Sequence, residues 1–254
     1  MLAQPTSMSE PTAIVSSRLA LLDVLRGVAI AAMIVYHFFF DLEFFGLAYM
    51  GVSERWGWIA FARAIPAMFI AIAGISLYLA HRKGIVWRNF WWRIGYLAAA
   101  AMLVTIVSWF IDPDAIIWFG ILHCIAASSV LGLAFLNAPL GVVIVSAVLV
   151  LIAPLFANQA LNAPVLLWLG LGTEEPPSDD YNPLFPWFAF LLIGIAIARL
   201  IAPYVTHAVW ARWSPRDPAT RTLALAGRHS LLIYLLHQPI LMGVLYGISR
   251  LPGL

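Results

Sequence analysis

Apolar runs of about 20 residues recur along the whole length of the chain, and each is long enough to cross a ~30 Å hydrocarbon core as a helix. The 254 residues are 63% hydrophobic and only 10% charged. A soluble domain is nearer half apolar and a quarter charged. The sequence therefore predicts an all-α integral membrane protein, a polytopic helical bundle whose main surroundings are a lipid bilayer.

Seven transmembrane spans are predicted, at residues 19–46, 61–80, 90–111, 115–136, 139–157, 184–202 and 227–249. Asp112-Pro113-Asp114 predicts a tight turn after the third span. The fifth span has the weakest pattern, because Pro154 interrupts it. Residues 1–17 lack the basic start and cleavage-site layout of a signal peptide. We interpret them as a disordered tail before a single transmembrane domain at 18–254.

The basic residues predict the orientation of the spans. With the N-terminus in the cytoplasm, eleven of the 14 Lys and Arg residues fall in inner segments and three in outer segments. Cytoplasmic segments of membrane proteins carry such an excess. The acidic connection 158–183 then lies outside and the basic connection 202–226 inside. The predicted topology is N-in, C-out, in the cytoplasmic membrane if the protein is bacterial.

Ionisable residues inside the spans are the candidates for chemistry, because each costs at least ~2.5 kcal/mol in a membrane. Arg26, His37 and Asp41 share the first span, and Asp41 follows His37 by one helical turn. Helical rise from the boundary charges places His37, His123 and His237 near one midplane depth. We expect His37 to act as a general base or acyl acceptor oriented by Asp41. The alternatives are interhelical hydrogen bonds for the histidines and a solvated Asp41 at the outer interface.

A metal site is a further alternative for the three histidines. Catalytic zinc usually has three protein ligands, which three midplane histidines could supply, but no span shows HExxH-type spacing. Cys124 is the single cysteine, so an intramolecular disulfide and a thiolate metal cluster are excluded. We expect no metal.

The inner face of the predicted bundle is strongly cationic. Arg26 lies near the inner boundary, three residues after Asp23, with which it can pair across one helical turn. Arg82, Lys83 and Arg228 fall in inner segments as well. Anionic lipid headgroups and a polyphosphate such as coenzyme A both suit such a face, and the charges alone do not choose between them.

On the outer side, residues 179–183 (DDYNP) lead directly into the aromatic segment 184–188 (LFPWF). Carboxylates, an amide and aromatic faces together suit a polar, sugar-like acceptor. Asp180, Tyr181 and Trp187 are the candidates for binding such a molecule. The alternative is a solvated loop that caps a membrane helix.

These motifs together resemble a known family. LDVLRG followed by His37, FGILHCIA in the fourth span and DYNPLFPWF before the sixth resemble the catalytic domain of heparan-alpha-glucosaminide N-acetyltransferase and its bacterial relatives. The ten residues between Arg26 and His37, and the ending GRHSLLIYLLHQPIL at 227–241, are similar to membrane acyltransferase family 3.

The resemblance implies a membrane-bound, acyl-CoA-dependent O- or N-acetyltransferase. Acetyl would pass from cytoplasmic acetyl-CoA to an amine or hydroxyl of a glycan or envelope sugar on the outer side. An intramembrane histidine is catalytic in the family, and the motif spacing assigns this role to His37. Beside it we expect Asp41 and His123 to be catalytic residues too, with His123 and His237 lining the point of acetyl transfer. The donor-binding residues on the inner side would be Arg26, Arg82, Lys83 and Arg228.

A transporter or flippase of an anionic metabolite or lipid, with the histidines as a proton relay, is the alternative function. Inverted repeats favour that class, and the sequence shows none. No nucleic-acid partner is expected, and a homo-oligomer is compatible with the pattern.

Overall fold

The computed structural model describes residues 19–205 and 213–251, so the tail predicted at 1–17 lies outside the described residues. The described part is helical and contains no strand. Its α-helices are α1 (Ala20–Phe44), α2 (Trp56–His81), α3 (Trp87–Ile111), α4 (Ile121–Gly132), α5 (Leu140–Ile152), α6 (Leu184–Val205), α7 (Pro218–Arg228) and α8 (Ser230–Ser249). Short 3-10 turns are η1 (Leu133–Phe135), η2 (Ala153–Phe156), η3 (Gln159–Leu161) and η4 (Pro164–Leu169).

Five of these helices, α1, α2, α3, α6 and α8, have the length and apolar composition needed to cross a membrane. The fourth and fifth predicted spans correspond to shorter apolar helices, α4 with η1 and α5 with η2. The chain from Asp112 to Gly120 is a turn followed by non-helical backbone, and η2 begins beside Pro154. An all-helical membrane protein is therefore confirmed, whereas seven crossings and their orientation stay predictions.

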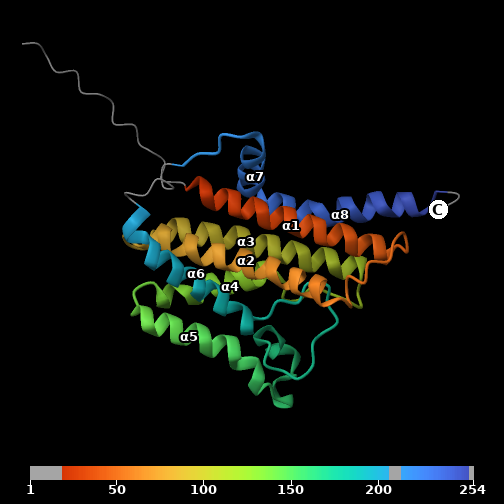
Figure 1. Ribbon diagram of the computed structural model, residues 1–254. Coiled ribbons are helices and arrows are strands. Elements are labelled where there is room, and N and C mark those ends of the chain that lie inside the picture. Colours follow the sequence, from red (N-terminus) through yellow and green to blue (C-terminus); the bar gives the residue numbers. More distant parts are fainter. Residues whose placement is uncertain (1–18, 206–212, 252–254) are drawn as a thin grey trace, which may run out of the picture.

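The long helices lie side by side along one direction, with α7 across them (Figure 1). α1 begins at one end of the bundle, and α8 ends at the opposite end (Figure 1). α2 and α6 pack closely, since a Cβ on Gly74 would lie 2.2 Å from the backbone oxygen of Leu191, and one on Gly194 would lie 2.1 Å from that of Ala71. Small residues let membrane helices approach this closely, so these two glycines fix the centre of the bundle.

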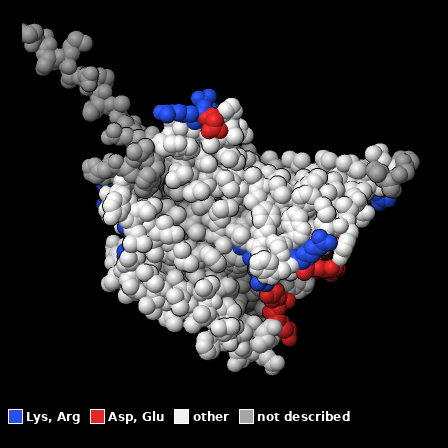
Figure 2. All heavy atoms as spheres, viewed as in Figure 1, with Lys and Arg blue, Asp and Glu red and all other residues white. Residues whose placement is uncertain are grey.

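Charged side chains are sparse on the surface of the bundle. In Figure 2 most of the visible face is uncharged, and the visible Asp and Glu residues gather mainly toward the end where α8 terminates. Charge at the ends and apolar side chains between them is the distribution that a bilayer requires. The surface thus supports the assignment as an integral membrane protein.

The last predicted span, 227–249, is divided in the structure. α7 ends at Arg228 and α8 begins at Ser230. α7 is a separate amphipathic helix, and Asp217 caps its start by accepting a hydrogen bond from the Thr220 N–H at 2.9 Å. The bonds from Thr220 lower the pKa of Asp217. Part of the basic connection is therefore a helix that packs across α1.

The crossing of α7 and α1 depends on glycine. A Cβ added to Gly227 would lie 1.7 Å from the backbone oxygen of Asp23. We expect Gly227→Ala to lower the unfolding temperature in detergent, because overpacking costs ~1–3 kcal/mol. Gly243→Ala in α8 is the matched control, since a Cβ there meets nothing within 4 Å and alanine is the better helix former. A Gly227→Ala protein as stable as the control would contradict this packing.

Candidate active site

Two of the three histidines predicted near the midplane meet inside the bundle. His37 of α1 and His237 of α8 lie edge to face, with their ring centroids 5.0 Å apart. We call them the histidine pair. In the described part of the chain, Nδ1 of His37 and Nε2 of His237 are buried without a hydrogen-bond partner. Buried polar atoms are nearly always paired, so these two nitrogens mark a place where a substrate group or water would bind.

A carboxylate and an amide stand beside the pair. Gln238 donates a hydrogen bond from Nε2 to Oδ1 of Asp41 at 2.8 Å. Asp41 is 0% exposed, so the alternative of a solvated Asp41 is wrong. Its expected partner also differs, because Asp41 is bonded to Gln238 while Nδ1 of His37 has no partner among the described residues. The remaining oxygens, Oδ2 of Asp41 and Oε1 of Gln238, are buried and unpaired within the same part of the chain.

Tyr234 joins the histidine pair to the connection before α6. Its ring centroid lies 5.8 Å from that of His237, and its hydroxyl donates to Oδ2 of Asp180 at 2.8 Å. The same Oδ2 accepts from the N–H of Ile121 at 3.1 Å, and Asn182 donates to Oδ1. Burial raises the pKa of Asp180, and these three hydrogen bonds oppose the rise. Asp180 thus links the connection to the start of α4 and to the second turn of α8.

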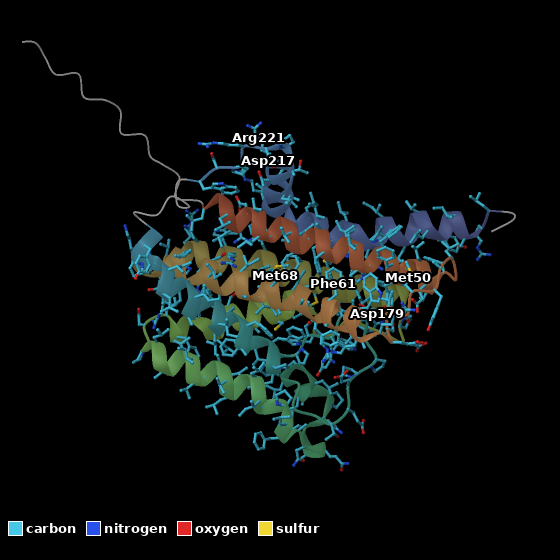
Figure 3. All side chains as sticks on the ribbon, viewed as in Figure 1. Met50, Phe61, Met68, Asp179, Asp217 and Arg221 are labelled. Carbon is cyan, nitrogen blue, oxygen red and sulfur yellow. The ribbon has the colours of Figure 1, made fainter. Side chains whose placement is uncertain are left out.

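The other acceptor-binding candidates also make contacts within the chain. Tyr181 donates from its hydroxyl to the backbone oxygen of Leu167 at 2.6 Å, and the Trp187 ring packs against Phe190 on α6 at 5.7 Å between centroids. Asp179 lies toward the end of the bundle where α8 terminates, as Met50 does, away from Asp217 and Arg221 on α7 (Figure 3). Their role in acceptor binding stays a prediction.

His123 is engaged at the start of α4. Its Nδ1 accepts from the N–H of Gly120 at 3.2 Å, and its Nε2 lies 3.4 Å from Oγ1 of Thr105. The depth predicted for it counted helical residues from Asp114. That premise was wrong, because α4 begins only at Ile121. Both ring nitrogens have partners, and the described contacts do not bring His123 to the histidine pair.

On the predicted inner side, Asp23 forms ion pairs with two arginines. Arg26 donates from Nη1 to Oδ1 of Asp23 at 3.2 Å, which confirms the pairing predicted from their spacing. Arg228 donates from Nε to Oδ2 at 3.2 Å, and Arg26 also donates from Nη2 to Oγ of Ser76 at 2.6 Å. Asp23 is 1% exposed, so the guanidinium of Arg26 is positioned by α1, α2 and α7 together.

The other two donor-binding candidates lie in the short connection after α2. Arg82 and Lys83 are both exposed. Arg82 donates from Nη1 to the backbone oxygen of Ala202 on α6 at 3.4 Å. They lie at the same end of the bundle as the start of α1, because α2 runs back toward that end (Figure 1). This position is compatible with the predicted role and does not test it.

A cavity of about 110 Å³ lies between the helices. Neither histidine of the pair lines it, but Tyr234 does, and the ring centroid of Tyr234 lies 5.8 Å from that of His237. Arg26, Arg93 and Ser230 supply its polar wall, and Tyr234 and apolar side chains of α2, α3, α4 and α8 supply the rest. Arg93 makes no hydrogen bond or ion pair with any residue that the structure describes. The sequence indicated Arg93 only as one of several inner basic residues, because nothing in its spacing shows that α3 turns it toward a cavity.

Across residues 19–205 and 213–251, no three His, Cys, Asp or Glu side chains are placed to hold a metal ion. Cys124 is buried, with Sγ near Oγ of Ser128 at 3.7 Å.

The sequence model of the family described as heparan-alpha-glucosaminide N-acetyltransferase, catalytic, matches residues 18–239. Comparison with curated protein sequences gave no match, and neither did comparison with solved structures. The matched range contains the histidine pair, Asp41 and both arginines of the cavity, and it confirms the resemblance seen in the motifs. The chain therefore belongs to the heparan-alpha-glucosaminide N-acetyltransferase catalytic-domain family.

Proposed function

We propose that the protein is a transmembrane acetyltransferase that moves acetyl from acetyl-CoA to an amine or hydroxyl of a sugar-like acceptor. The observation that carries the proposal is the histidine pair, which lies inside an apolar bundle with two ring nitrogens that have no hydrogen-bond partner among the described residues. Polar groups so placed in a membrane are usually functional. The family of the chain supplies the reaction class.

The donor enters at the end of the bundle that carries Arg26 and Arg93. The phosphates of coenzyme A are anionic, and two guanidinium groups line the cavity there. A space of about 110 Å³ is too small for the whole donor, so the nucleotide lies outside it, on the basic surface near Arg82, Lys83 and Arg228. The excess of basic residues supports a cytoplasmic location for this end, which is where acetyl-CoA is found.

The acetyl group is transferred at the histidine pair. His37 acts as a general base toward the acceptor or carries the acetyl group as a transient acyl-imidazole. The acceptor's hydroxyl or amine donates hydrogen bonds, and the unpaired oxygens of Asp41 and Gln238 beside the pair would accept them. The acceptor approaches from the side of the connection that carries Asp180 and Tyr181. The acetyl group therefore crosses the bundle from the donor to the acceptor.

Turnover with a defined probe tests the proposal. Purified protein in detergent receives acetyl-CoA labelled in the acetyl group, with D-glucosamine as the acceptor probe. Labelled N- or O-acetylated sugar should form and depend on His37, while His229→Ala, an exposed histidine outside the pair, should leave the rate unchanged. Acetyl-CoA that is neither cleaved nor transferred would contradict the proposal. Movement of intact acetyl-CoA across proteoliposomes would instead indicate a carrier.

A further inference from the structure

A single hydrogen bond fixes the tautomer of His237. Its Nδ1 lies 2.6 Å from the backbone oxygen of Tyr234. A carbonyl oxygen can only accept, so Nδ1 must carry the proton of this bond. In a neutral imidazole the second nitrogen then has a lone pair and no hydrogen. Nε2 of His237 is consequently a base.

This basic nitrogen is available to accept a hydrogen bond from a substrate. Nε2 of His237 is buried and has no hydrogen-bond partner among the described residues. The His237 ring meets His37 edge to face, and the adjacent residue, Gln238, holds the buried Asp41. No hydrogen bond in the described part of the chain fixes the tautomer of His37 in the same way. The two imidazoles are therefore not equivalent.

We infer that His237 is a second catalytic residue, whose Nε2 takes the proton from the acceptor while His37 carries the acetyl group. This inference rests on the proposed function. It divides between two residues the two roles that the sequence allows for His37 alone. The division follows from geometry, because a base held ready by a backbone carbonyl lies against an imidazole that has no such anchor.

The reaction balances in two steps. In the first, a ring nitrogen of His37 attacks the carbonyl carbon of acetyl-CoA, the C–S bond breaks, and the N–H proton of the acetylated ring passes to the thiolate to give coenzyme A. In the second, the acceptor's oxygen or nitrogen attacks the acetyl carbon and the C–N bond to His37 breaks. Nε2 of His237 takes the acceptor's proton and returns it to His37.

The second step needs His237, and the first does not, so the two can be measured separately. The variant is His237→Asn, whose amide can still donate to the Tyr234 carbonyl but lacks a basic nitrogen. Exchange of labelled coenzyme A into acetyl-CoA should stay within about threefold of wild type. Transfer to D-glucosamine should fall by ~10²–10⁴, the usual range for loss of a general base. His229→Asn serves as the control and should change neither rate.

Hydroxylamine provides a third readout, because it is a strong nucleophile that is neutral at the assay pH and captures acyl groups without a base. His237→Asn should still transfer acetyl to hydroxylamine, whereas His37→Ala should not. Loss of exchange, hydroxylamine capture and sugar transfer by the same factor in His237→Asn would overturn the inference. Sugar transfer within tenfold of wild type, or wild-type transfer without any exchange, would do so as well. A wild-type protein that leaves acetyl-CoA intact would instead refute the proposed function.

Discussion

Replacing His37 by Ala should lower acetyl transfer by ~10²–10⁴, the range over which a positioned general acid or base contributes. If His37 carries the acetyl group, its loss should lower the rate of transfer at least as much, because His237 is the only other described histidine whose ring contacts this site. Affinity for acetyl-CoA should be nearly unchanged, since the cavity arginines are not altered. Steady-state turnover and calorimetric binding on the same purified sample measure the two effects.

The stability of His37→Ala separates a catalytic histidine from a structural one. A hydrogen bond between membrane helices averages ~0.6 kcal/mol, and Nδ1 of His37 has no partner among the residues that the structure describes. The variant should therefore unfold at nearly the wild-type temperature. Retention of more than a tenth of wild-type turnover would show that His37 is not the central residue of the site.

Replacing Arg93 by Met should weaken acetyl-CoA binding strongly. A hydrogen bond to a charged group contributes ~1.5–3 kcal/mol, which corresponds to roughly a 10- to 150-fold higher Kd. Met keeps the apolar stem that packs between the helices and removes only the guanidinium. Because Arg93 has no hydrogen-bond or ion-pair partner in the described chain, the change leaves no orphaned group and should leave the fold intact.

The matched control is Arg88→Met, on the same helix and exposed outside the cavity. It should change the affinity little, because an exposed charge acts through screened electrostatics. Arg26→Ala should also weaken acetyl-CoA binding. Arg26 donates hydrogen bonds to Asp23 and Ser76 as well, so this substitution would change both ligand binding and helix packing. Equal affinity of Arg93→Met and wild type, measured by calorimetry, would remove Arg93 from the donor site.

Local spacing made part of this site predictable. The pairing of Arg26 with Asp23 follows from three residues of helical separation, and it is present in the structure. The position of His37 inside an apolar helix also follows from the sequence. The turn at Asp112–Asp114 is present too, with Ala115 N–H donating to Asp112 O at 3.2 Å. Each of these features depends on neighbours within one or two turns of chain.

The remaining features depend on contacts between distant segments. Gln238 reaches Asp41 across 197 positions, and only the packing of α8 on α1 brings them together. Helical periodicity could not indicate that Asp180 would accept a hydrogen bond from the Tyr234 hydroxyl. His123 was misplaced for a different reason, because the predicted span ignored the non-helical residues before Ile121. The separation of α7 from α8 was missed because residues 227–249 read as one apolar run.

The central claim is that the acetyl group is delivered to the histidine pair between α1 and α8. A structure with S-acetonyl-coenzyme A, whose ketone resembles the thioester but cannot be transferred, tests it most directly. The account predicts the ketone carbon ~3–3.5 Å from a ring nitrogen of His37, the separation of a near-attack geometry, with a phosphate beside Arg93. An analogue bound with its ketone away from both histidines would contradict the account.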